Sequence, residues 1–216
     1  MLKALLFDLD ETLYHPDTGM LPAGDRTITQ YLCDQFGCDW SGAEAIRVRF
    51  TQRYGTTAAG VEAEFGISQA DFYAATVEQV DPTHYLGPAP ALGAMLAAIP
   101  AQRHIFTNAT RPYTDGVLRA LGIAGHFIEV FDVAFAGWRP KPALQPYQRA
   151  VAALSLPPEQ IGIIEDNPAN LVPARDLGMT TFLLRQDHEA AHYRLGDILD
   201  LYQVLRQQQL CPQHGE

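Results

Sequence analysis

Five short apolar runs, separated by segments of helical periodicity, most constrain what this chain can fold into. Each run has four to six residues, which suits a strand buried on both faces of a sheet. Strands that alternate with helices predict an α/β fold, in which helices cover both faces of a parallel sheet. The runs occupy residues 2–7, 103–106, 130–133, 161–164 and 180–184.

The long segment between the first two runs interrupts this alternation. It contains apolar stripes of helical spacing, around Ile28, Ile46, Val61 and Tyr73, and no convincing strand. We therefore predict a small helical bundle inserted early into the α/β core. A capping box formed by Ser41 and Glu44, and an N-cap at Ser68, mark two of the expected helix starts. The predicted ranges are 1–14 and 88–216 for the core and 15–87 for the insert.

Charge and cysteine content exclude several classes of protein. The chain has 216 residues, and its 15 basic and 25 acidic side chains give a net charge of −10. This charge argues against a nucleic-acid polymer or a membrane surface as partner, because both are held by clustered basic residues. The three cysteines are an odd number without a CxxC pair, which argues against a disulfide framework or a structural zinc site. We expect a cytoplasmic protein that is a monomer or a weak homodimer.

Two acidic side chains follow the first predicted strand, in the segment FDLDETLY at residues 7–14. Side chains two positions apart on a strand share a face, so Asp8 and Asp10 are expected to point the same way. The carboxyl end of a parallel strand is where such sheets bind ligands. A pair of carboxylates placed there suits cation binding, nucleophilic catalysis or acid–base catalysis.

Polar residues also follow the second strand, and a lysine stands alone between two prolines. The hydroxyl of Thr107 and the amides around Asn108 can hold a phosphoryl oxygen, or they can cap the helix that follows. Pro140 and Pro142 keep Lys141 out of a helix interior, on an extended or turn segment. A lysine held in this way can aim its charge at one point.

The fourth predicted strand ends in two consecutive acids, Glu165 and Asp166. Two acids at the edge of a core need a cation or hydrogen-bond donors to satisfy them. Pro173 favours a following helix that begins near Asn170, because a first-turn amide needs no partner in the helix. Asn170 is then predicted to be the N-cap of that helix.

These four motifs, in this order, resemble those of the haloacid dehalogenase superfamily, whose commonest members are magnesium-dependent phosphatases. A closer resemblance is to its pyrimidine 5′-nucleotidase-like branch. The resemblance implies a Rossmann-like core with strand order 3-2-1-4-5, in which Asp8 follows the central strand and the helical insert forms a cap over the site. The segments that carry it are FDLDETLY, YGTTAAGVEAEFGI (54–67), KPALQPYQRAV (141–151) and IIEDNPANLVPARDLGMTTFLL (163–184).

The same resemblance implies a role for each acidic motif residue. Asp8 attacks phosphorus to form an aspartyl-phosphate, and Asp10 protonates the leaving alkoxide and then activates water. The Asp8 carboxylate, the Asp10 carbonyl oxygen and Asp166 hold Mg²⁺, which prefers oxygen ligands. The presence of Asp10 favours phosphate over halide chemistry, because dehalogenases of the superfamily lack this second aspartate.

The remaining motif residues are expected to bind the phosphoryl group. Thr107 and the Asn108 amide hold its oxygens, and Lys141 offsets the charge of Asp8 and of the phosphate. Glu165 stands where relatives often have aspartate, so it is either a metal ligand or an acceptor for Lys141.

The resemblance predicts a phosphomonoesterase that acts on pyrimidine nucleoside 5′-monophosphates. In the cap, Tyr54, Thr56 and Thr57 either contact the nucleoside or serve as packing and capping residues. One alternative is a phosphatase or phosphomutase for another small phosphometabolite, such as a sugar phosphate. A binding module with a silent site is a second alternative. A third is a zinc hydrolase, because His188 to His192 match the pattern HExxH.

Overall fold

The computed structural model describes residues 1–211 and separates into two compact units. Residues 1–15 and 86 onward form one, which we call the core unit, and residues 16–85 form the other, which we call the inserted unit. Residues 212–216, the end of the predicted core range, lie outside the described residues. The function of the inserted unit as a cap stays a prediction.

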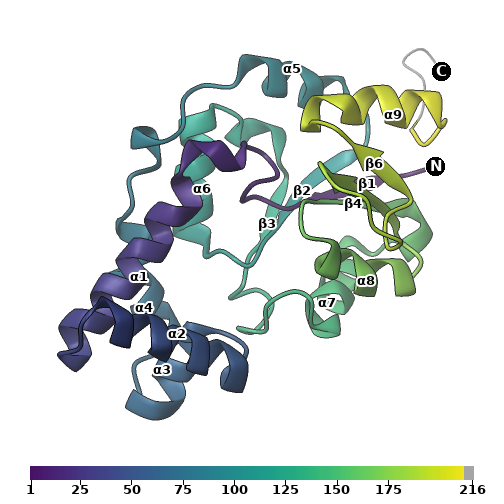
Figure 1. Cartoon of the computed structure of the whole chain (residues 1–216). Coiled ribbons are helices and arrows are strands. Elements are labelled where there is room, and N and C mark those ends of the chain that lie inside the picture. Colours follow the sequence, from purple (N-terminus) through teal and green to yellow (C-terminus); the bar gives the residue numbers. More distant parts are fainter. Residues whose placement is uncertain (212–216) are drawn as a thin grey trace. The chain divides into compact units, whose positions relative to one another are not determined.

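Among the described residues, the core unit contains one parallel sheet with the strand order β3-β2-β1-β4-β5-β6 (Figure 1). This arrangement confirms the predicted α/β class and the predicted order of the first five strands. In the central strand β1, Phe7 pairs with Ile105 of β2 and with Ile164 of β4. The strands are β1 (Ala4–Phe7), β2 (Gln102–Phe106), β3 (Glu129–Phe131), β4 (Ile161–Glu165), β5 (Thr180–Leu184) and β6 (Tyr193–Leu195).

Two strands differ from the sequence prediction. β6 was not expected, because it has three residues and only Leu195 among them is buried, so it has no apolar run to reveal it. β3 ends at Phe131, although the predicted strand continued to Val133. The chain turns there because the Asp132 carboxylate accepts hydrogen bonds from the backbone N–H groups of Arg111 and Phe135, at 3.0 and 2.7 Å.

Helices cover both faces of the sheet, α5 and α9 on one and α7 and α8 on the other (Figure 1). No helix among residues 1–211 is long and apolar enough to cross a membrane. The helices of the core unit are α5 (Pro90–Ala98), α6 (Arg111–Leu121), α7 (Leu144–Leu154), α8 (Pro168–Asp176) and α9 (Leu201–Gln207), with short 3₁₀ helices η4 (Ala124–His126), η5 (Pro158–Gln160) and η6 (Ile198–Asp200).

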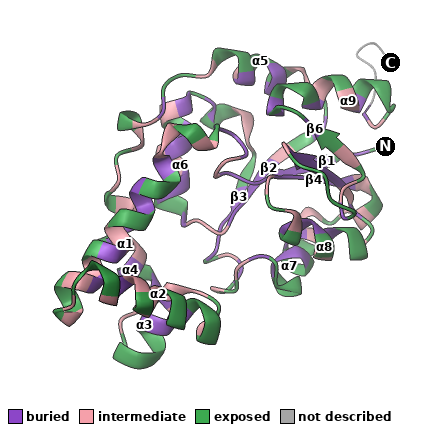
Figure 2. Cartoon of the chain, in the orientation of Figure 1, coloured by how far each residue is buried: buried purple, intermediate pink, exposed green. Residues whose placement is uncertain are grey.

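The central strands are buried along their whole length, as Figure 2 shows by their purple colour. Leu6 and Ile163 belong to one buried cluster with Tyr147 of α7 and Leu171 of α8. Each fully buried aliphatic or aromatic side chain contributes about 1.5–3 kcal/mol relative to its exposed state. The sheet is therefore a rigid platform for the polar residues that follow its strands.

The inserted unit is helical, and its buried centre joins residues of all four α-helices: Leu32, Ala43, Phe50, Ala58, Val61 and Phe72. Gly60 is required by close packing, because a Cβ atom at this position would lie 2.3 Å from Cγ of Phe50. The helices are α1 (Met20–Phe36), α2 (Trp40–Tyr54), α3 (Thr57–Phe65) and α4 (Gln69–Ala75), with η1 (Pro16–Thr18), η2 (Val77–Gln79) and η3 (Pro82–His84).

The helix caps of this unit agree with one prediction and overturn another. Ser68 caps α4, since its hydroxyl accepts from the backbone N–H of Asp71 at 3.1 Å. The predicted capping box of Ser41 and Glu44 is wrong. α2 begins earlier, and its N-cap is Asp39, which accepts from the N–H of Gly42 at 2.8 Å.

Candidate active site

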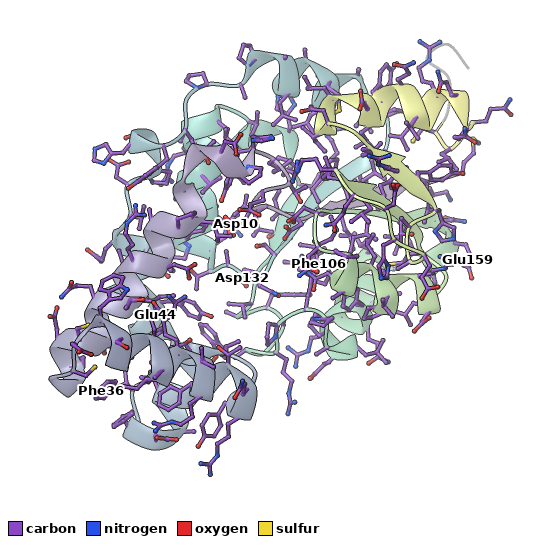
Figure 3. All side chains as sticks on the ribbon, viewed as in Figure 1. Asp10, Phe36, Glu44, Phe106, Asp132 and Glu159 are labelled. Carbon is purple, nitrogen blue, oxygen red and sulfur yellow. The ribbon has the colours of Figure 1, made fainter. Side chains whose placement is uncertain are left out.

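The carboxyl ends of neighbouring strands bring the predicted site residues of the core unit together. Asp8 directly follows β1, Thr107 directly follows β2, and Glu165 is the last residue of β4. Figure 3 labels two residues at these strand ends, Asp10 after β1 and Phe106 at the end of β2. Because the strands run parallel, their polar side chains share one edge of the sheet.

Lys141 lies at the centre of this group and is buried together with its partners. Its ammonium donates to Oδ1 of Asp8 at 2.8 Å, to Oε1 of Glu165 at 2.5 Å and to the Phe106 carbonyl oxygen at 2.8 Å. The side chains of Lys141 and Glu165 are 1% and 0% exposed. All three protons of the ammonium therefore have acceptors, as a buried charge requires.

The charges of this cluster do not balance, because one ammonium faces two carboxylates. Burial alone would lower the pKa of Lys141, but the negative charges of Asp8 and Glu165 outweigh it and raise this pKa above its ordinary value. Burial and the charge of Asp8 raise the pKa of Glu165, and Lys141 opposes that rise. The cluster therefore has a net attraction for a further cation.

Asn108 fixes the backbone of Lys141, a use of this side chain that the sequence did not suggest. Its Oδ1 accepts from the Lys141 N–H at 2.7 Å, and its Nδ2 donates to the Lys141 carbonyl oxygen at 3.0 Å. Lys141 lies on a turn before α7, consistent with the extended or turn segment predicted from its flanking prolines. The Asn108 side chain thus positions the lysine, and only its backbone amide is available for the predicted phosphate contact.

Glu165 is held by protein donors at both of its oxygens. Oε1 accepts from Asn170 Nδ2 at 2.8 Å as well as from Lys141, and Oε2 accepts from the backbone N–H of Asn167 at 3.2 Å. The prediction that Asn170 is an N-cap is wrong. α8 begins at Pro168 with Asn167 as its N-cap, so Asn170 lies within the helix and its side chain reaches back to Glu165.

Three carboxylates form a cluster of the kind that holds a metal ion. One oxygen from each of Asp8, Glu165 and Asp166 lies within 4.8 Å of the others. The Thr12 hydroxyl bridges two of them, at 3.4 Å from Oδ2 of Asp8 and 3.3 Å from Oδ1 of Asp166. Burial and the charge of Asp8 raise the pKa of Asp166. Thr12 was not singled out from the sequence, although a hydroxyl four residues after Asp8 was a visible signal.

Asp10 is held by two tyrosines rather than by a cation. The hydroxyls of Tyr14 and Tyr113 both donate to its Oδ1, the latter at 2.9 Å. The pKa of Asp10 is raised to about 6, chiefly by burial and also by the charge of Asp8, although the hydrogen bonds from the two tyrosines oppose this rise. Burial and the nearby Asp10 also raise the pKa of each tyrosine, so both remain protonated donors.

Thr107 is buried at the end of β2, where its hydroxyl oxygen accepts from the backbone N–H of Ala109 at 3.0 Å. A hydroxyl that accepts one hydrogen bond still has its own proton to donate. The reading of Thr107 or Asn108 as a helix cap is therefore wrong, because Thr110 is the N-cap of α6. The Thr107 hydroxyl orders the segment before that helix and keeps its own proton as a donor for an anion.

Two further residues hold the backbone of the site. Arg185 donates to the carbonyl oxygen of Glu11, and Gln186 donates to that of Asp166. Glu11 and Arg185 both have positive φ angles, 55° and 61°, which place these two loops in tight left-handed turns. No sequence signal marked Arg185 or Gln186, because they follow β5 in a polar stretch without a motif.

The haloacid dehalogenase-like hydrolase family matches residues 2–178, which is most of the chain and includes all four motifs of the sheet edge. The chain belongs to this family. The hydrolase is 26% identical to protein CbbY of Rhodobacter capsulatus, over 91% of this chain and 94% of that protein. It is 31% identical to validoxylamine A 7′-phosphate phosphatase of Streptomyces hygroscopicus subsp. limoneus, over 46% of this chain and 47% of the phosphatase.

A crystal structure supports the same assignment of fold. CbbY from Rhodobacter sphaeroides, solved in complex with phosphate, superposes on the hydrolase with a TM-score of 0.68. The match covers 93% of this chain and 96% of that one, at 20% identity. At this level of identity the likeness shows the shared fold.

The three predicted cap residues of the hydrolase lie in the inserted unit. Tyr54 ends α2, and its hydroxyl donates to Oε1 of Glu64 at 3.1 Å. Thr56 is the N-cap of α3 and accepts from the N–H of Ala59 at 3.0 Å, and Thr57 is the first residue of that helix. Tyr54 and Thr56 thus have partners within their own unit, and contacts with a substrate stay a prediction.

The HExxH segment of the hydrolase does not form the helix that a zinc protease requires. Residues 188–192 form a turn between β5 and β6. Nδ1 of His188 accepts from the N–H of Ala190 at 3.1 Å, and Nδ1 of His192 lies 2.8 Å from the Thr181 hydroxyl. The two histidines therefore have structural partners, and they lack the one-turn helical spacing that would place both on a common metal.

Proposed function

We propose that this hydrolase is a magnesium-dependent phosphomonoesterase that acts through an aspartyl-phosphate on Asp8. The observation that carries the proposal is the placement of Asp8. One of its oxygens accepts a hydrogen bond from the buried ammonium of Lys141. Asp10 follows β1 and Asp166 follows β4, so both acidic residues come after strands that end at this edge of the sheet. The phosphatase among its relatives supports phosphate esters as the substrate class.

The donors at this edge fit Mg²⁺. Hard oxygen ligands are what this ion prefers, and the carboxylate cluster of Asp8, Glu165 and Asp166 supplies them. Asp8, Asp166 and the Asp10 carbonyl oxygen would hold the ion. Glu165 serves instead as the acceptor for Lys141, because it is fully buried and already accepts three hydrogen bonds, from Lys141, Asn167 and Asn170. Bound there, Mg²⁺ would neutralise negative charge on the phosphoryl group.

The side chains divide the reaction into two displacements. In the first, a carboxylate oxygen of Asp8 bonds to phosphorus while the ester P–O bond breaks, and Asp10 gives its proton to the departing alkoxide oxygen. In the second, Asp10 takes a proton from water as the water oxygen bonds to phosphorus, and the P–O bond to Asp8 breaks. Inorganic phosphate leaves, and Asp8 is a carboxylate again.

Lys141 and Thr107 prepare the site for the negative charge of the phosphoryl group. The ammonium reduces the repulsion between Asp8 and an approaching phosphate dianion, and it needs no reorganisation because Asn108 already holds its backbone. The Thr107 hydroxyl and the Asn108 amide donate to phosphoryl oxygens. Phosphoryl transfer depends mainly on such positioning and charge neutralisation.

Two substrate classes are proposed. The first class is the pyrimidine nucleoside 5′-monophosphates, and it is supported by the resemblance of residues 54–67 to the nucleotidase branch. Another small phosphometabolite, such as a sugar phosphate, is favoured by the validoxylamine phosphatase relative. For the second class, either hydrolysis or mutase chemistry is consistent with the site, since a mutase returns the phosphoryl group to a hydroxyl.

Phosphate release from a panel of esters tests the function. The panel contains uridine, cytidine and adenosine monophosphates, hexose and pentose phosphates and an aryl phosphate, each with Mg²⁺ and with excess chelator. We expect release from at least one ester, its loss with chelator and its recovery when Mg²⁺ is restored. Preference for the uridine and cytidine esters supports the nucleotidase, whereas preference for a sugar ester supports the alternative. No release from any ester, together with no isomerised product, would favour a non-catalytic binding module.

Substitution of both histidines of the HExxH segment, H188A/H192A, is expected to leave phosphate release unchanged. Neither residue contacts the carboxylate cluster, and both are used in hydrogen bonds of the β5–β6 turn. The measurement is the steady-state rate on the best ester of the panel, with thermal unfolding to detect a loss of stability. Complete loss of activity in a folded variant would revive a zinc site at these histidines.

A further inference from the structure

Two tyrosine hydroxyls converge on one oxygen of Asp10, and the mechanism above assigns them no function. Tyr14 and Tyr113 both donate to Oδ1, and the side chains come from different elements. Tyr14 lies in the turn after β1, and Tyr113 lies in the first turn of α6. Both residues are buried, with 7% and 6% of their surface exposed. Each hydroxyl is therefore held by packing as well as by its hydrogen bond.

We propose that Tyr14 and Tyr113 are positioning residues, which orient the Asp10 carboxyl group so that its other oxygen, Oδ2, transfers the proton. The inference rests on the proposed phosphomonoesterase function. Two donors on one oxygen restrict rotation of the carboxyl group about its Cβ–Cγ bond. Among the described residues none donates a hydrogen bond to Oδ2, so this oxygen is left for proton transfer.

The same contacts serve both displacements. When Asp10 is protonated on Oδ2, Oδ1 is a carbonyl oxygen, and when Asp10 is ionised, Oδ1 is a carboxylate oxygen. Oδ1 accepts hydrogen bonds in both states. Oδ2–H gives its proton to the leaving alkoxide in the first displacement, and Oδ2 takes a proton from water in the second. The tyrosines therefore need no movement between the two steps, and Asp10 keeps one orientation throughout.

A purely structural role for the tyrosines predicts a different result from a positioning role. If the hydroxyls only satisfy a buried carboxyl group, their loss weakens cleavage of every ester to a similar extent. If they aim the proton of Asp10, their loss affects only esters whose leaving group must be protonated. Alkoxides are such leaving groups, whereas dinitrophenolate leaves without a proton.

The test compares the variants Y14F, Y113F and Y14F/Y113F on two esters with Mg²⁺ present. The esters are 2,4-dinitrophenyl phosphate and the alkyl monophosphate that the wild-type enzyme cleaves best. The measured quantity is kcat/KM, which reports cleavage of the ester bond and excludes the later hydrolysis of the aspartyl-phosphate. We expect the double variant to lose about 100-fold on the alkyl ester, the low end of general-acid contributions, and to change little on the aryl ester.

Control variants separate the possible failures. Y202F removes a hydroxyl on α9, outside the site, and should leave both values unchanged. Equal losses on the two esters, or no loss on the alkyl ester, would overturn the inference and leave the proposed function standing. Activity of D8N on either ester would instead contradict the proposed function itself. Thermal unfolding identifies any variant that fails to fold, and the single variants, which each keep one donor, then supply the comparison.

Discussion

Asp8→Asn is expected to abolish phosphate release while the protein stays folded. An amide oxygen is a poor nucleophile, so no phosphoryl-enzyme bond forms, and loss of a covalent nucleophile reduces turnover by about 10⁴-fold or more. The introduced amide keeps an oxygen that can accept from Lys141, and the substitution removes one of the negative charges that crowd Glu165 and Asp166. The unfolding temperature should therefore stay the same or rise. The measurements are the steady-state rate and the thermal unfolding midpoint.

A matched substitution outside the site controls for this change. Asp187 lies on an exposed turn, where its side chain is 78% exposed and pairs with Arg194. D187N makes the same chemical change and should retain wild-type turnover. Wild-type activity in D8N would rule out Asp8 as the nucleophile. A strongly lowered unfolding temperature in D8N would show instead that the carboxylate is needed for the fold.

Lys141→Ala is expected to reduce both activity and stability. Removal of one preorganised charge from such a site costs about 10²–10³-fold in turnover, and here the charge also orients the nucleophile. Truncation further leaves the buried carboxylates of Asp8 and Glu165 without their cation, a change that typically costs about 3–5 kcal/mol. Steady-state rates and denaturant unfolding measure the two effects separately.

A second substitution tells these effects apart. Glu165→Gln in the K141A background removes one of the two unpaired charges, so K141A/E165Q should recover part of the stability and none of the activity. Lys3→Ala, on the exposed residue just before β1, controls for the loss of a lysine and should change neither. Recovery of turnover in the double variant would show that Lys141 acts on the fold alone.

The placement of the candidate site was largely predictable from local patterns. Short apolar runs become buried strands wherever they occur, and the polar residues after them must lie at a strand end. This reasoning placed Asp8, Glu165 and Asp166 at one edge of the sheet, and in the structure their carboxylates lie close together there. The flanking prolines of Lys141 likewise predicted a turn that holds it outside a helix.

Partners of these residues were not predictable in the same way. Tyr113 meets Asp10 although the two are 103 positions apart, and no local pattern marks a tyrosine in the first turn of a helix as a partner of an aspartate. β6 has no sequence signal, because only Leu195 of its three residues is buried and they do not form an apolar run. Pro173 predicts a helix that begins near Asn170, but α8 begins at Pro168 and accommodates this proline in its interior.

Hydrophobic periodicity and chain direction were enough to predict the α/β class, the order of the first five strands and the edge at which the acidic residues lie. The tertiary structure alone decided what each side chain does there. In the packed fold Glu165 accepts a hydrogen bond from Lys141, and the Asn108 side chain bonds to the Lys141 backbone. Both tyrosine hydroxyls donate to one oxygen of Asp10. Hydrogen bonds depend on distances of a few tenths of an ångström between groups far apart in the chain, and only the packed fold sets those distances.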